Sequence, residues 1–92
     1  MDHVMTRDAG PSGWAELADR RFVVDGWEIF EGDTSNPNVC RGWFRCEDPL
    51  FTATPGSEVR LHVTTGNDTV RDLTAEIVRR STTGPIWEFR AE

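Results

Sequence analysis

The segment Glu58–Thr65 alternates apolar and polar side chains without interruption. Val59, Leu61 and Val63 fall on one side of an extended strand, and the residues between them fall on the other. Such a strand needs partners, because an isolated strand or hairpin is at best marginally stable in water. Similar stretches recur along the chain, separated by residues typical of turns at 33–38, 49–57 and 66–68. This spacing predicts a mainly β fold, a small single-domain antiparallel β-sandwich or barrel.

The dipeptide Asp25-Gly26 is typical of the two-residue type I′ turn of a β-hairpin. Pairing the chain about this turn sets Arg20 opposite Glu31 and predicts a hairpin over residues 20–31. The same pairing places four apolar side chains on one face of the hairpin. These are Phe22, Val24, Trp27 and Ile29.

The N-terminal part of the chain does not alternate in this way. Residues 1–12 are polar and contain Gly10-Pro11, so we expect a flexible N-terminal tail. Ser12 can cap a helix in which Trp14 and Leu17 share one face. We therefore expect a short N-terminal helix over residues 13–20, at the start of a single β-rich domain that spans residues 13–92.

The stretch 69–81 is compatible with a strand and with a helix. On a helix, Val70, Leu73 and Ile77 lie on one face; on a strand, Leu73, Ala75 and Ile77 alternate with other residues. The many β-branched residues favour the strand. The alternative is an α+β fold in which 69–81 is a helix packed on the sheet.

The C-terminal segment 85–91 is predicted to be a strand that follows a turn at Thr83-Gly84. If 69–81 is also a strand, the two can pair about this turn. The pairing predicts one ion pair, one apolar pair and one cation–π contact. These are Arg79 with Glu88, Val78 with Phe89, and Arg80 with Trp87.

The two cysteines of the chain, Cys40 and Cys46, lie in the segment CRGWFRC. On one straight strand they face the same side about 20 Å apart, which is too far for a disulfide bond. We therefore expect buried, inert thiols on an inner face that also holds Gly42 and Phe44. The spacing of the cysteines and His62 matches no standard zinc site, so neither a metal nor another cofactor is expected.

The opposite face of the same segment holds Arg41, Trp43 and Arg45. A tryptophan between arginines on an open strand face has the composition of a protein–protein hot spot. Arg80 and Trp87 are candidates for the same surface. The sequence therefore predicts a non-enzymatic protein-binding or assembly module that recognises a protein partner or a second copy of itself.

An alternative function rests on His62, which shares a strand face with Arg60. A pocket near these residues predicts a β-barrel that binds a small molecule, or a minimal enzyme that uses acid/base chemistry. No serine lies in a nucleophile-elbow sequence, and no residue is predicted to be catalytic on sequence grounds alone.

The charge of the chain restricts its partners. The net charge is −6 and the pI is about 4.8, which disfavours general binding to nucleic acids or to anionic membranes. No apolar run approaches the roughly 18 residues of a membrane span. The first residues lack the apolar core of a secretory signal, so we expect a cytoplasmic location.

Overall fold

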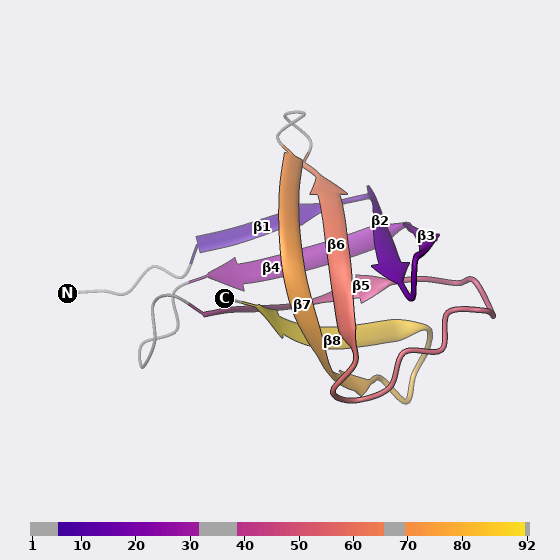
Figure 1. The fold of residues 1–92 in the computed structure, drawn as a ribbon. Coiled ribbons are helices and arrows are strands. Elements are labelled where there is room, and N and C mark those ends of the chain that lie inside the picture. Colours follow the sequence, from indigo (N-terminus) through magenta and orange to yellow (C-terminus); the bar gives the residue numbers. More distant parts are fainter. Residues whose placement is uncertain (1–5, 32–38, 66–69, 92) are drawn as a thin grey trace.

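The structure is a computed structural model that describes residues 6–31, 39–65 and 70–91 (Figure 1). Its strands are β1 (Thr6–Gly10), β2 (Ser12–Leu17), β3 (Arg20–Val24), β4 (Gly26–Glu31), β5 (Cys40–Arg45), β6 (Glu58–Thr64), β7 (Val70–Arg80) and β8 (Ile86–Ala91). They form one open antiparallel sheet in the order β1-β4-β5-β8-β7-β6-β2-β3. The described residues contain no helix, so none of them forms one that could cross a membrane. The turns predicted at 33–38 and 66–68 lie outside the described residues.

The mainly β fold is confirmed, and two details of the N-terminal part differ from expectation. The predicted helix over 13–20 is wrong, because Ser12–Leu17 is strand β2, paired with β3 on one side and β6 on the other. Residues 6–10, expected in a flexible tail, form strand β1 and pair with β4. Hydrogen bonding to two neighbouring strands overrides the weak helical pattern of this segment.

The first four strands form one long hairpin with a single register. Thr6 pairs with Glu31 at one end and Leu17 pairs with Arg20 at the other. The turn is Ala18-Asp19, and both residues have positive φ angles, 52° and 65°. These are the backbone angles of a type I′ turn, which matches the twist of the strands it joins.

The predicted hairpin about Asp25-Gly26 is therefore wrong, since β3 and β4 continue along the same arm of the long hairpin. The predicted pairing of Arg20 with Glu31 is also absent, because Arg20 pairs with Leu17. The apolar face was nevertheless identified correctly. All four side chains assigned to it are buried: Phe22, Val24, Trp27 and Ile29.

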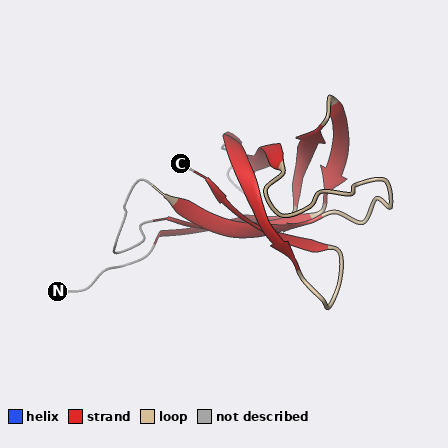
Figure 2. Cartoon of the chain, turned by 60° about the horizontal axis from the view of Figure 1, so that its bottom comes forward, coloured by secondary structure: helices blue, strands red, loops and turns tan. Residues whose placement is uncertain are grey.

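Both arms of the long hairpin bend, one at Pro11 and the other at Asp25. The bends send β1 and β4 toward β5 and β8, whereas β2 and β3 extend the part of the sheet formed by β6 and β7. In Figure 1, β6 and β7 cross over the layer formed by β1, β4, β5 and β8. Figure 2 shows the same curl of the sheet from another side. The side of the sheet that faces the enclosed core is called the inner face below.

The core is a single cluster of apolar side chains on the inner face. Phe51, from the predicted loop 49–57, enters this cluster and contacts the ring of Trp87 edge-on with 4.8 Å between centroids. Cys40 and Cys46 are buried free thiols, as expected from their positions on β5 and at its end. Burial is the main cause that raises the pKa of both thiols above the usual value.

Residues 70–80 form strand β7, so the strand interpretation of this segment is confirmed and the helix alternative is wrong. Two predicted cross-strand contacts with β8 are present. Nε of Arg79 lies 2.6 Å from Oε2 of Glu88, and the guanidinium of Arg80 lies 5.3 Å from the centroid of the Trp87 ring. The third is wrong, because a β-bulge inserts Val78 as an extra residue.

The bulge shifts the register by one residue, so that Ile77 pairs with Phe89 and Val78 lies exposed on the outer face. Without this one-residue shift, the register with β8 could match either the inward-facing residues of β7 or the turn that follows β7, but not both.

We expect Gly42→Ala to destabilise the protein by about 1–3 kcal/mol, the usual range for overpacking a dense core. A Cβ atom at this position would lie 2.2 Å from the carbonyl oxygen of Glu28 and 2.8 Å from Cζ of Phe89. Urea unfolding measures the change. Gly84→Ala is the matched control, because its added Cβ would meet nothing within 4 Å. Equal stability of wild type and Gly42→Ala would contradict this close approach of β4 and β5.

Ala18→Gly should increase the free energy of unfolding by about 1 kcal/mol, because the left-handed conformation costs an L residue with a Cβ atom roughly 1–2 kcal/mol. Gly26→Ala should change it little, since Gly26 does not have a positive φ angle and its added Cβ would contact Trp43 at 3.9 Å. Thermal unfolding of both variants tests the position of the turn. A destabilised Gly26→Ala and an unchanged Ala18→Gly would instead support a turn at Asp25-Gly26.

Candidate functional site

The outer face of β5 carries Trp43, whose side chain is partly exposed between β4 and β8. Its indole N–H donates a 3.0 Å hydrogen bond to Oε1 of Glu28, the residue directly opposite on β4. Its neighbour on the other side is Glu88 of β8, which accepts a hydrogen bond from Arg79. Because the N–H group already has an acceptor, the ring surface of Trp43 is the part that can contact another molecule.

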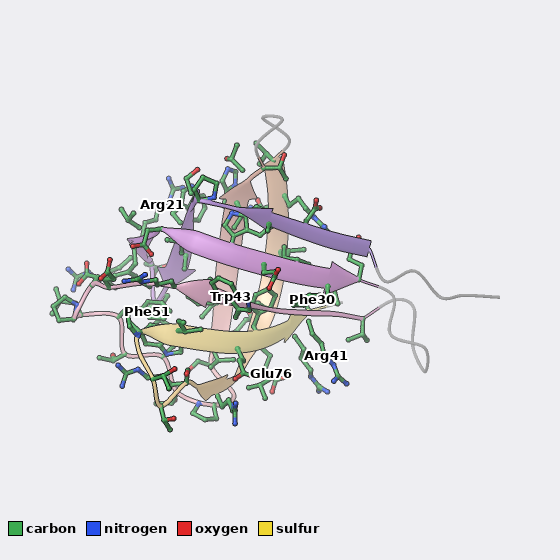
Figure 3. All side chains as sticks on the ribbon, turned by 180° about the vertical axis from the view of Figure 1, so that it is seen from behind. Arg21, Phe30, Arg41, Trp43, Phe51 and Glu76 are labelled. Carbon is green, nitrogen blue, oxygen red and sulfur yellow. The ribbon has the colours of Figure 1, made fainter. Side chains whose placement is uncertain are left out.

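A hollow of about 310 Å³ opens beside this tryptophan. It is lined by side chains from β4, β5, β8 and the turn before β8, and we call it the Trp43 hollow. The lining includes Phe30, Arg41, Trp43, Ser81, Ile86 and Glu88. Figure 3 views the molecule from behind and labels Trp43, Phe30 and Arg41 over β4, β5 and β8. Three of these side chains, Phe30, Trp43 and Ile86, are apolar and partly exposed, and the other lining side chains are polar. An apolar centre with a polar rim is the composition of a protein interface.

The three residues of the predicted strip lie on one outer strand face. Arg41 and Arg45 are exposed on either side of the partly exposed Trp43. Arg45 donates a 3.1 Å hydrogen bond to Oε1 of Glu47, and its Nε lies 3.9 Å from Oδ1 of Asp25. Arg41 lines the Trp43 hollow, whereas Arg45 is directed to these two carboxylates outside it.

Arg80 and Trp87 are not part of this surface. The Trp87 side chain is 3% exposed, lies in the core, and donates a hydrogen bond to the carbonyl oxygen of Ala53 at 3.3 Å. Arg80 stacks on Trp87 and lines a different hollow, formed with the loop that contains Phe51. The structure therefore separates these two residues from Arg41 and Trp43.

A second outer cluster crosses the other half of the sheet. The rings of Trp14 and His62 are parallel to within 6° and their centroids are 4.7 Å apart. The guanidinium carbon of Arg21 lies 4.2 Å from the centroid of the Trp14 ring. Since β3 and β6 flank β2, Trp14 has one of these groups on each side. We call Arg21, Trp14, His62 and Asp72 the Trp14 ladder.

Of the alternative site, His62 belongs to the Trp14 ladder, and Arg60 contacts the ladder at Asp72. Arg60 donates two hydrogen bonds to Asp72, at 3.1 and 3.0 Å, whereas Nδ1 of His62 lies 3.9 Å from the same carboxylate. The hydrogen bonds from Arg60 lower the pKa of Asp72 below its usual value, against a smaller opposing effect of desolvation. The carboxylate that could serve His62 is therefore held by Arg60, and the imidazole ring is stacked on Trp14.

The described part of the chain holds no group of three or more His, Cys, Asp or Glu side chains that could bind a metal ion. Comparison with protein-family models, curated proteins and solved structures finds no match to this chain. The site must therefore be interpreted from its own residues.

Sequence reasoning missed Phe30, Ile86 and Trp14. Phe30 follows the inward-facing Ile29, so strict alternation on β4 could have indicated a large apolar residue on the outer face. Trp14 was assigned to a helix, and only the strand assignment places it beside His62. Ile86 gave no such signal, because its position depends on the register between β5 and β8.

Arg60→Met should raise the pKa of Asp72 toward the ordinary value of about 3.9, because it removes both hydrogen bonds that favour the carboxylate. NMR titration of the Asp72 side chain measures this change. In the wild type, the contact stabilises the fold above the ordinary pKa of aspartate, and this stabilisation is lost as the pH falls through the lower folded-state pKa. Arg90→Met is the control, because Arg90 lies beside Glu76 instead. An unchanged titration of Asp72 in Arg60→Met would contradict the contact.

Proposed function

We propose that this protein is a small, acidic, non-enzymatic protein-binding module. Its ligand is a protein partner that places an apolar side chain in the Trp43 hollow. One observation carries the proposal: a tryptophan held in place by a hydrogen bond to Glu28 remains partly exposed beside Phe30 and Ile86. Interfaces of this kind concentrate their binding free energy in a few aromatic and arginine side chains at the centre of the contact.

The surroundings of Trp43 support binding rather than a purely structural role. The rings of Trp14 and Trp87 are stacked by aromatic or guanidinium groups, whereas the contact described for the Trp43 side chain is its hydrogen bond to Glu28. Glu28 fixes the indole before any partner arrives, so less side-chain freedom is lost on binding. Arg41 and Glu88 at the rim offer charges of both signs for polar contacts.

We further interpret the curled sheet as a small β-barrel. The long hairpin supports this interpretation, because one arm pairs through β2 with β6 and the other pairs through β4 with β5. A barrel of this type gives the β4-β5-β8 face a rigid backbone, which suits recognition on preformed strands.

The alternative function, a small-molecule pocket or an acid/base site at His62, has weaker support. Stacking on Trp14 covers one face of the imidazole ring, and Asp72 is engaged by Arg60. A general base needs to reach the proton that it removes, within about 3 Å or through one water molecule.

Trp43→Ala should weaken binding of the partner by about 30-fold or more, the effect expected of a hot-spot residue. The partner is first captured from cell extract with the wild-type protein and identified, and its purified form is then titrated by calorimetry. Val70→Ala is the matched control, because Val70 is 53% exposed on a different strand, outside the Trp43 hollow.

Circular dichroism and thermal unfolding separate loss of binding from loss of fold. If Trp43→Ala unfolds, Trp43 is a core residue and the proposal is wrong. Ile86→Thr provides a second measurement, because it removes an apolar wall of the hollow and keeps a β-branched residue in β8. Wild-type affinity of both folded variants for the captured partner would also reject the proposal.

A further inference from the structure

A second hollow of about 540 Å³ adjoins the Trp43 hollow on the outer face of the sheet. We call it the arginine hollow. Its lining includes Arg41, Pro55, Glu76, Val78, Glu88 and Arg90. Arg41 and Glu88 line both hollows, so the two form one continuous depression across β5, β8 and β7. Figure 3 labels Arg41 and Glu76 in the same view as Trp43.

The arginine hollow brings two like charges together. Arg41 of β5 and Arg90 of β8 lie directly opposite each other in the antiparallel pair, and both are exposed. Like charges that face each other on neighbouring strands destabilise a sheet. The pair therefore does not serve the stability of the fold, whereas neighbouring guanidinium groups are suited to holding a carboxylate through charge-assisted hydrogen bonds.

The carboxylates of the arginine hollow leave room for one more. Nε of Arg90 lies 3.4 Å from Oε1 of Glu76. A guanidinium group carries five N–H donors, so Arg90 can keep this contact and also bind a further carboxylate. Glu88 accepts a 2.6 Å hydrogen bond from Nε of Arg79, so an arginine beyond the lining already balances its charge. These side chains together carry an excess of positive charge.

Other arginines of the outer face suit a partner carboxylate less well. Arg45 donates a 3.1 Å hydrogen bond to Glu47. Arg60 donates two hydrogen bonds to Asp72, at 3.1 and 3.0 Å. Neither Arg45 nor Arg60 lines the Trp43 hollow or the arginine hollow. The pair in the arginine hollow is thus the one that continues the surface around Trp43.

The spacing of the two hollows restricts the shape of the partner. Trp43 and Arg41 are two residues apart on β5, so they share a face and lie about 7 Å apart along the strand. Side chains two residues apart in an extended partner segment have the same direction and the same spacing. An extended segment with one side chain in the Trp43 hollow therefore places the side chain two residues away over Arg41.

We propose that the partner of the Trp43 hollow is an extended acidic segment. It places an apolar side chain beside Trp43 and, two residues away, an Asp or Glu side chain between Arg41 and Arg90. The inference rests on the proposed function, because it specifies the partner of the same site. The net charge of −6 repels an acidic partner at long range, so the preference for a carboxylate comes from this local contact.

Selection from random decapeptides displayed on phage tests the proposal, with the folded wild-type protein as bait. Enriched peptides should share an apolar residue with Asp or Glu two positions away. A parallel selection on Trp43→Ala identifies the peptides that bind at the Trp43 hollow, because these should no longer be enriched. Trp43-dependent peptides without an acidic residue at this spacing would overturn the inference and leave the proposed function intact. If no enriched peptide depends on Trp43, the proposed function fails as well.

Calorimetry with one selected peptide and its amide version, Asp to Asn or Glu to Gln, locates the carboxylate. The wild-type protein should bind the acidic peptide about tenfold more tightly, as expected for a hydrogen bond to a charged group. Arg41→Gln and Arg90→Gln should each reduce this ratio. Arg20→Gln is the control matched in charge, because Arg20 is exposed on β3, outside both hollows, and should keep the ratio.

Thermal unfolding verifies that the three glutamine variants are folded. A tenfold ratio that persists in both Arg41→Gln and Arg90→Gln would place the carboxylate elsewhere and contradict the proposal. A ratio that falls equally in Arg20→Gln would show a general charge effect and would also contradict it. Loss of binding in Trp43→Ala alone, with no response to the two arginines, would support the Trp43 hollow and reject the acidic partner.

Discussion

The bend in the long hairpin is the constraint on which the rest of the fold depends. Five residue pairs on each side of the bend keep the same register. The inward-facing residues nevertheless change from even-numbered to odd-numbered positions along the chain, at Pro11 on one arm and at Asp25 on the other. Because side chains alternate strictly along a strand, a straight hairpin would expose either Phe22 and Val24 or Trp27 and Ile29. The bend buries all four and delivers β4 to β5 and β2 to β6.

Arg71 connects strands that the curled sheet brings near each other without pairing them. The residue lies on the inner side of β7 and donates hydrogen bonds to Asp8 and Glu31, which come from β1 and β4. Desolvation alone would lower the pKa of Arg71, but the two carboxylates outweigh it and the net pKa is raised. Partly buried ion pairs add little net stability compared with apolar packing, and these pairs join β7 to two strands that are not its neighbours in the sheet.

The sequence carried enough information for the strands and their faces, but not for the partners of each strand. Alternation identified the buried positions of β3, β4, β5 and β6, because burial follows directly from a period of two. The turn was misplaced because Asp25-Gly26 is the stronger local signal, whereas the actual turn uses Ala18-Asp19 at the cost of a left-handed alanine. The pairing of β4 with β1 and of β3 with β2 compensates the conformational cost of this turn, and no local sequence pattern indicates that pairing.

Position in the sheet also decides why one outer tryptophan is a candidate site and the other is not. Trp14 stands between β3 and β6, and both neighbours supply flat groups, Arg21 and His62, that cover its ring. Trp43 of β5 stands between β4 and β8. Both of these strands supply a carboxylate, Glu28 from β4 and Glu88 from β8. A carboxylate can accept the indole N–H but repels the negative face of the ring. Glu28 therefore holds the Trp43 side chain through its hydrogen bond, and neither Glu28 nor Glu88 is a flat group that could stack on the ring, so its apolar surface stays partly exposed.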